Sequence, residues 1–126
     1  TGLRLAAWLA ERPEVNRVLH PALPGDPGYD IWRRDFSGAS GLFGVVLNPA
    51  PEKAVAAMLN GLELFGMGYS WGGYESLAIP TYPHKVRETS DWDPANPCLR
   101  FHAGLEHPDD LIADLDAGLH RLNELL

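Results

Sequence analysis

Residues 98–115 read Cys98-Leu-Arg-Phe-His-Ala-Gly-Leu-Glu-His-Pro-Asp-Asp-Leu-Ile-Ala-Asp-Leu115, and they predict a strand followed at once by a helix. The segment Leu99–Ala103 has the length of a strand, and its apolar residues alternate with Arg100 and His102. Pro108 suits the first turn of a helix, and Asp109 and Asp110 place negative charge at its positive end. The helix then carries one apolar stripe, formed by Leu111, Ile112, Leu115, Leu119 and Leu122.

Hydrophobic patterns elsewhere predict the remaining helices and strands. We expect further strands over residues 15–20, 42–47 and 74–79, the last closed by Pro80, and a helix over residues 3–12. A second helix starts at either Asn48-Pro49 or Pro51-Glu52, carries an apolar face as far as Phe65, and is ended by Gly66 and Gly68. Residues 29–34 suit a short helical turn, and 80–97 a long surface loop. Consecutive strands without an intervening helix favour antiparallel pairing. The sequence therefore predicts a single α/β (α+β) domain over residues 1–126, a small, mostly antiparallel sheet with helices packed on one face.

Composition excludes several kinds of partner. The 126 residues include 10 Lys and Arg against 17 Asp and Glu, a formal net charge of −7, which argues against nucleic acid and anionic membranes as partners. No apolar run approaches the length of a membrane span. Cys98 is the one cysteine, so an internal disulfide and a multi-cysteine zinc site are excluded. The first residue is Thr1, and we therefore expect a processed or cut N-terminus.

Gly68-Tyr-Ser-Trp-Gly72 matches the Gly-x-Ser-x-Gly pattern of nucleophilic serines. That chemistry needs a strand before the serine, a helix after it, and His and Asp partners. Here a helical pattern precedes the motif and a strand-like run follows it, so we expect a glycine-rich turn. A serine hydrolase using Ser70 remains an alternative, and labelling by a fluorophosphonate would support it.

Neither a metal nor a phosphate site is expected. His102 and His107 are predicted on different elements, and no His-Glu-x-x-His pattern occurs. The glycine-rich residues 38–44 precede a strand, whereas a phosphate cradle precedes a helix.

Arg100 is the most informative charged residue, because it lies inside the apolar context Cys98-Leu-Arg-Phe101. Arginine is seldom buried unless it is paired. Its planar guanidinium can hold a carboxylate by two parallel hydrogen bonds. The local sequence leaves three possibilities: a ligand carboxylate, an internal acid, or an edge strand on which Arg100 points to water.

Three segments in series resemble the pyridoxal-phosphate enzymes of Cys/Met metabolism. They are His20-Pro-Ala-Leu-Pro-Gly25 through Trp32-Arg-Arg-Asp-Phe-Ser-Gly-Ala-Ser-Gly-Leu-Phe43, then Tyr69-Ser-Trp-Gly-Gly-Tyr-Glu-Ser-Leu77, then Leu99-Arg-Phe-His-Ala-Gly-Leu-Glu106 with Asp109-Asp-Leu-Ile-Ala-Asp-Leu115. Their order and spacing resemble the C-terminal domain of that family, which belongs to fold type I. The segment around Trp71 is most similar to the β-lyase branch, because γ-synthases and γ-lyases tend to carry Ser-Leu-Gly-Gly there.

The resemblance implies β-elimination, which converts L-cystathionine, a small amino-acid substrate, into homocysteine, pyruvate and ammonia in methionine biosynthesis. It implies that Arg100 holds the substrate α-carboxylate and that Ser70, Trp71 and Tyr69 line the same pocket. Pyridoxal 5'-phosphate is the implied cofactor, and the implied assembly is a cytoplasmic homotetramer.

One part of the family's machinery has no counterpart here. The cofactor lysine and the phosphate-binding residues of the family lie in an N-terminal domain, and this chain has only Lys53 and Lys85, neither in the lysine motif's context. We therefore expect no catalytic, cofactor-binding or metal-binding residue in this chain, and no turnover by it alone. A stand-alone domain that binds small carboxylates or a partner is the alternative from a different class.

Overall fold

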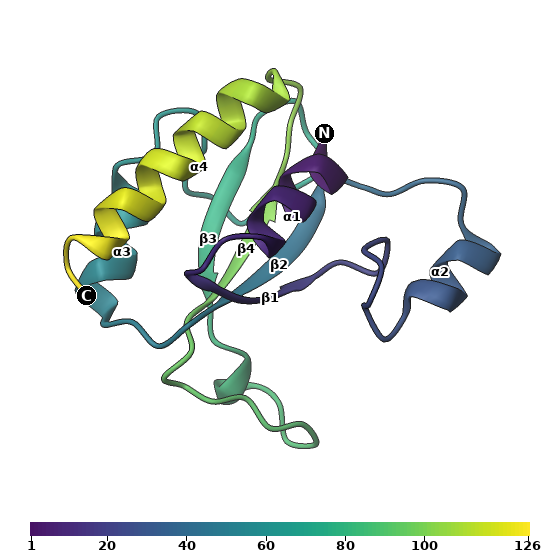
Figure 1. The fold of residues 1–126 in the computed structure, drawn as a ribbon, viewed down its shortest axis with the longest axis horizontal. Coiled ribbons are helices and arrows are strands. Elements are labelled where there is room, and N and C mark those ends of the chain that lie inside the picture. Colours follow the sequence, from purple (N-terminus) through teal and green to yellow (C-terminus); the bar gives the residue numbers. More distant parts are fainter.

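A computed structural model describes all residues, 1–126, and its centre is a four-stranded sheet in the order β1-β2-β4-β3 (Figure 1). The strands are β1 (Val15–Leu19), β2 (Leu42–Leu47), β3 (Leu77–Thr81) and β4 (Cys98–His102). Every neighbouring pair runs antiparallel. The predicted antiparallel sheet is confirmed, and β4, which carries Arg100, is one of its two inner strands.

Helices α1 (Gly2–Ala10), α3 (Glu52–Asn60) and α4 (Pro108–Asn123) pack together on one face of this sheet, as predicted (Figure 1). Helix α2 (Tyr29–Asp35) lies apart, on an arm that extends from the body between β1 and β2, and none of its residues is buried. No helix is both long and apolar enough to cross a membrane.

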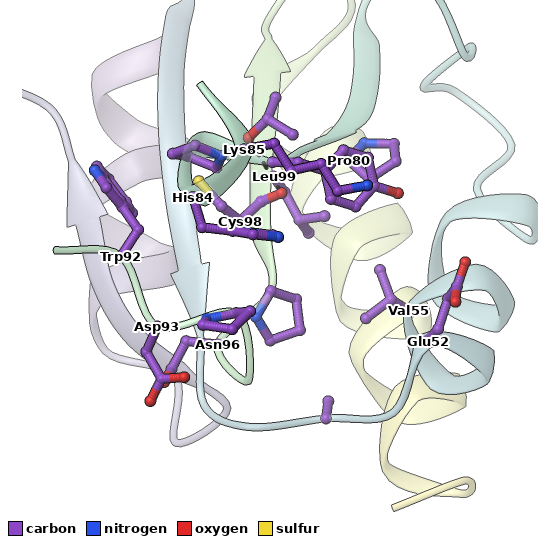
Figure 2. A pocket seen from close by; sticks show the side chains of 16 residues that line it. Glu52, Val55, Pro80, His84, Lys85, Trp92, Asp93, Asn96, Cys98 and Leu99 are labelled. Carbon is purple, nitrogen blue, oxygen red and sulfur yellow. Dashed lines mark hydrogen bonds between the residues drawn. The ribbon is translucent and has the colours of Figure 1, made fainter. Parts of the chain in front are cut away.

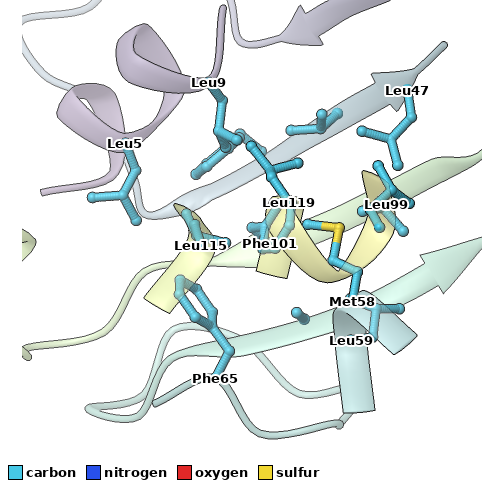
Figure 3. Packing of buried hydrophobic residues seen from close by; sticks show 14 of the residues in the cluster. Leu5, Leu9, Leu47, Met58, Leu59, Phe65, Leu99, Phe101, Leu115 and Leu119 are labelled. Atoms are coloured by element: carbon cyan, nitrogen blue, oxygen red, sulfur yellow. The ribbon is translucent and has the colours of Figure 1, made fainter. Parts of the chain in front are cut away.

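The core fills the space between the sheet and these three helices (Figure 3). Leu99 and Phe101 of β4 are fully buried there, in contact with the apolar stripe of α4. Successive side chains of a strand point to opposite faces, so Arg100 and His102 lie on the sheet face away from the helices. Packing of the core against one face of β4 therefore leaves the opposite face for its polar side chains.

Helix α3 is shorter than predicted. It ends at Asn60, with Gly61 as its C-cap, whereas the apolar spacing had suggested a continuation to Phe65. Asp114 of α4 accepts hydrogen bonds from the backbone amides of Glu63, Leu64 and Phe65, at 2.8–3.4 Å. A carboxylate that binds successive amides holds the chain off the helical path, which local periodicity could not predict.

Strand β3 also departs from its predicted bounds. It begins at Leu77 and includes Pro80, which we expected to end it. Pro80 lies opposite Leu99 of β4. Proline has no amide hydrogen to donate to a neighbouring strand. Because β3 is an edge strand, the nitrogen of Pro80 can face the side on which no strand follows, and no hydrogen bond of the sheet is lost. The predicted loop that follows contains one short 3₁₀ turn, Pro83–Lys85.

Candidate functional site

Arg100 lies at the middle of the outer sheet face, between Gly44 of β2 and Ile79 of β3. Its Nη2 donates a hydrogen bond to the carbonyl oxygen of Tyr69 at 2.6 Å and approaches that of Ser70 at 3.5 Å. No carboxylate of the chain pairs with Arg100. Its Nε and Nη1 groups make no hydrogen bond within the protein, so the guanidinium retains donors for an external acceptor.

The turn from Tyr69 to Gly73 extends over Arg100 and faces solvent. The exposed fraction is 84% for Tyr69 and 62% for Trp71, and Ser70 is also exposed. No residue of this turn forms a backbone–backbone hydrogen bond. Gly72 has a positive φ of 82°, a conformation that glycine adopts without strain. The structure thus brings Tyr69 and Ser70 to Arg100 through their carbonyl groups, and Trp71 follows them on the same turn.

His102 is a second contact to this turn, and the sequence analysis did not single it out for that role. Its Nε2 lies 3.0 Å from the carbonyl oxygen of Gly73, and its Nδ1 accepts from the amide of Gly72 at 3.4 Å. Both ring nitrogens of His102 are thus engaged by the backbone of the turn. One feature of the sequence pointed to this contact. His102 lies two residues after Arg100, and this spacing places both side chains on the same face of a strand.

A polar network fixes Ser76, in the segment between this turn and β3. Glu106 accepts from the Ser76 hydroxyl at 2.7 Å and from the Ser76 amide at 3.1 Å, while the hydroxyl accepts from the Gly104 amide at 2.8 Å. Burial acts to raise the pKa of Glu106, but the hydrogen bonds from Ser76, together with its own backbone amide and the nearby His102, outweigh it and lower the pKa. The ionised carboxylate of Glu106 is therefore the form that holds Ser76.

The geometry does not support Ser70 as a nucleophile. The segment Gly68–Gly72 follows a loop and is followed by β3 with no helix after the serine. Three His and Asp residues downstream of Ser70 could have served as partners: His84, His102 and Asp114. His102 binds the glycine backbone and Asp114 binds the amides of residues 63–65, while His84 lies in the short turn Pro83–Lys85 after β3. The Ser70 hydroxyl makes no hydrogen bond within the protein.

The residues of this chain do not fit a pyridoxal-phosphate anchor. Lys53 is exposed in the first turn of α3, and the exposed Lys85 lies over the Tyr82 ring at 4.5 Å from its centroid. Neither lysine belongs to a strand of the sheet that carries Arg100, and no group of three or more metal-binding side chains is present. A cavity of about 240 Å³ near the start of β4, lined in part by Lys85, Trp92 and Cys98, does not include Arg100 (Figure 2).

The fold and the site define a small α/β domain that presents an arginine beneath a glycine-rich turn, with donors directed outward. Residues 1–120 match the sequence profile of the Cys/Met metabolism PLP-dependent enzymes. The chain belongs to that family, whose cofactor is pyridoxal phosphate.

Individual relatives agree with this assignment. The chain is 50% identical to cystathionine β-lyase of Salmonella typhimurium and 48% identical to the cystathionine β-lyase MetC of Escherichia coli, in each case over 97% of this chain and 32% of the relative. A crystal structure of cystathionine γ-synthase from Xanthomonas oryzae pv. oryzae in complex with cystathionine superposes with a TM-score of 0.78, at 29% identity, over 99% of this chain and 34% of that one. The chain thus spans about a third of the length of these relatives.

Proposed function

We propose that this chain is the C-terminal domain of a carbon–sulfur lyase that cleaves L-cystathionine by β-elimination, and that Arg100 binds the substrate α-carboxylate. The observation that carries the proposal is the state of Arg100. It is partly buried in a sheet, it pairs with no acid of the chain, and it keeps unused donors beside the Tyr69–Gly73 turn. The identity of 48–50% to β-lyases favours that branch of the family.

The role of Arg100 is to bind and to orient. Two parallel hydrogen bonds from a guanidinium to a carboxylate fix both the position and the plane of that group. Holding the carboxylate restricts rotation of the α-carbon, and so selects which of its bonds is presented for cleavage. Ser70, Trp71 and Tyr69 line the other side of the same pocket in this proposal. The cofactor supplies the electron sink from the rest of the enzyme.

The reaction branch is tested by the products. The full-length enzyme with bound cofactor is incubated with L-cystathionine, and the products are separated and identified. β-Elimination yields homocysteine, pyruvate and ammonia, which is the expected result. Cysteine with a four-carbon oxo acid would instead identify a γ-lyase, and formation of cystathionine from cysteine and an activated homoserine would identify a γ-synthase. The solved γ-synthase relative makes this comparison necessary.

The division of labour between domains gives a second test. We propose that the 126-residue chain alone forms no stable imine with pyridoxal phosphate, because its two lysines lie outside any cofactor site. Borohydride reduction followed by mass measurement should leave the mass unchanged. A stoichiometric reduced adduct would overturn this part of the proposal.

A stand-alone carboxylate-binding domain remains the second candidate, since Arg100 is presented without any lysine beside it. Calorimetry of the isolated chain with L-amino acids separates the two, because saturable binding would favour the stand-alone domain. We further propose that the full-length enzyme is a cytoplasmic homotetramer, which fractionation and the native mass would test.

A further inference from the structure

We propose that His102 is a positioning residue that holds the Tyr69–Gly73 turn in place over Arg100 while Arg100 is engaged by substrate. The inference rests on the proposed function of Arg100 and assigns a role to a side chain that touches neither substrate nor cofactor in that proposal.

Side chains alone attach the Tyr69–Gly73 turn to the sheet. Its backbone forms no hydrogen bond with other backbone groups between Tyr69 and Gly73. The side chains that bind this stretch are those of Arg100, at Tyr69 and Ser70, and of His102, at Gly72 and Gly73. Two side chains on one face of β4 therefore hold the two ends of an exposed turn.

The two attachments differ in their burial and in whether a substrate would compete for them. Arg100 is only partly buried, and its hydrogen bond to Tyr69 uses one of the donors that a substrate carboxylate would compete for. His102 is 7% exposed, and both of its ring nitrogens are engaged with the turn. When Arg100 turns to a carboxylate, His102 is the attachment that remains.

Without His102, the turn would lose its fixed position. Gly72 and Gly73 have many accessible backbone conformations, so an unattached turn samples many positions. A ligand that needs one of these positions then binds in proportion to the population of that position. Loss of His102 should consequently weaken substrate binding more than it slows the chemical step.

The experiment compares three variants of the full-length enzyme with bound cofactor. His102→Leu removes both hydrogen bonds at similar volume. His102→Gln retains one acceptor and one donor on its amide and serves as the conservative variant. His20→Leu is the matched control, since His20 is also buried, at 3% exposed, but binds the amide of Ala22 at the edge of the sheet.

We expect His102→Leu to raise KM for L-cystathionine about tenfold, the consequence of losing two ordinary hydrogen bonds, with kcat changed by less than about threefold. His102→Gln should recover most of the change in KM, and His20→Leu should leave KM as it is. Deuterium exchange in the peptide covering residues 68–76 should be faster in His102→Leu and close to wild type in His102→Gln.

Other outcomes overturn the inference. An unchanged KM together with unchanged exchange at 68–76 in His102→Leu would show that the turn does not depend on His102. If His102→Leu fails to fold, His102→Gln decides, and a tenfold rise in KM despite its retained donor and acceptor would count against the role. Failure of the proposed function is distinguishable, because the wild-type enzyme would then not cleave L-cystathionine.

Discussion

Asp114 is predicted to be the polar side chain on which the fold depends most. It lies on α4, is nearly buried, and accepts four hydrogen bonds from the amides of Glu63, Leu64 and Phe65. Replacement by alanine leaves three backbone donors without a protein partner. Glu63 and Leu64 are exposed and can recruit water, whereas Phe65 is buried and cannot.

The magnitude follows from these contacts. A hydrogen bond to a charged group contributes about 1.5–3 kcal/mol, and solvation of two of the donors recovers part of that, so Asp114→Ala should lower the free energy of unfolding by about 3 kcal/mol. Asp114→Asn keeps one acceptor and should lose about half as much. With a urea m-value of about 1–3 kcal/mol/M, the alanine variant should unfold at a midpoint about 1–3 M lower.

The assay is urea denaturation of the 126-residue chain, followed by circular dichroism. Asp116→Ala is the matched control, because Asp116 lies on the same helix and its carboxylate contacts only His120, at 3.6 Å. Its midpoint should stay close to that of the wild type. If Asp114→Ala shifts the midpoint no more than Asp116→Ala, the account of the loop after α3 is refuted.

Three further predictions concern the site's surroundings. The pKa of Glu106 in the folded chain lies below its ordinary value, so the unfolded chain binds more protons. Stability should therefore fall as the pH is lowered below about 5 towards the folded pKa. Glu106→Gln should make stability less dependent on pH in acid titrations. Gly104→Ala would place a Cβ in steric overlap with the carbonyl oxygen of Tyr74, and it should destabilise the chain in thermal melts and speed exchange in the turn. Arg121→Met removes the hydrogen bonds that Arg121 donates to two carbonyls at the end of α3, and should cost about 1 kcal/mol in urea denaturation.

The sequence predicted the regular elements best where local signals and tertiary packing agree. β2 occupies the predicted residues 42–47, and α4 begins at Pro108 as its charges and proline indicate.

The disagreements arise where distant residues override local pattern. Leu62 and Phe65 continue the apolar spacing of α3, but Asp114, some fifty positions away in the sequence, binds the amides there and ends the helix early. Pro80 reads as a strand end until the strand order shows that β3 lies at an edge.

In the candidate site, too, the sequence indicated some residues and not the contacts that depend on distant parts of the chain. The sequence singled out Arg100 as a charged residue in an apolar context, and the structure shows it bound to the carbonyl groups of Tyr69 and Ser70. Its role as the ligand of a carboxylate stays a prediction. The attachment of the turn by His102 depends on which backbone groups meet across the sheet face, and a single sequence does not carry that information.

The most direct test of the central claim is the KM of the full-length Arg100→Lys enzyme for L-cystathionine. Lysine keeps the charge but cannot form two parallel hydrogen bonds, so KM should rise about tenfold or more, because one charge-assisted bond is lost. Arg87→Lys, on the exposed loop before β4, is the control and should behave as wild type. A KM for Arg100→Lys equal to that of the wild type would contradict the assignment of Arg100 as the carboxylate ligand.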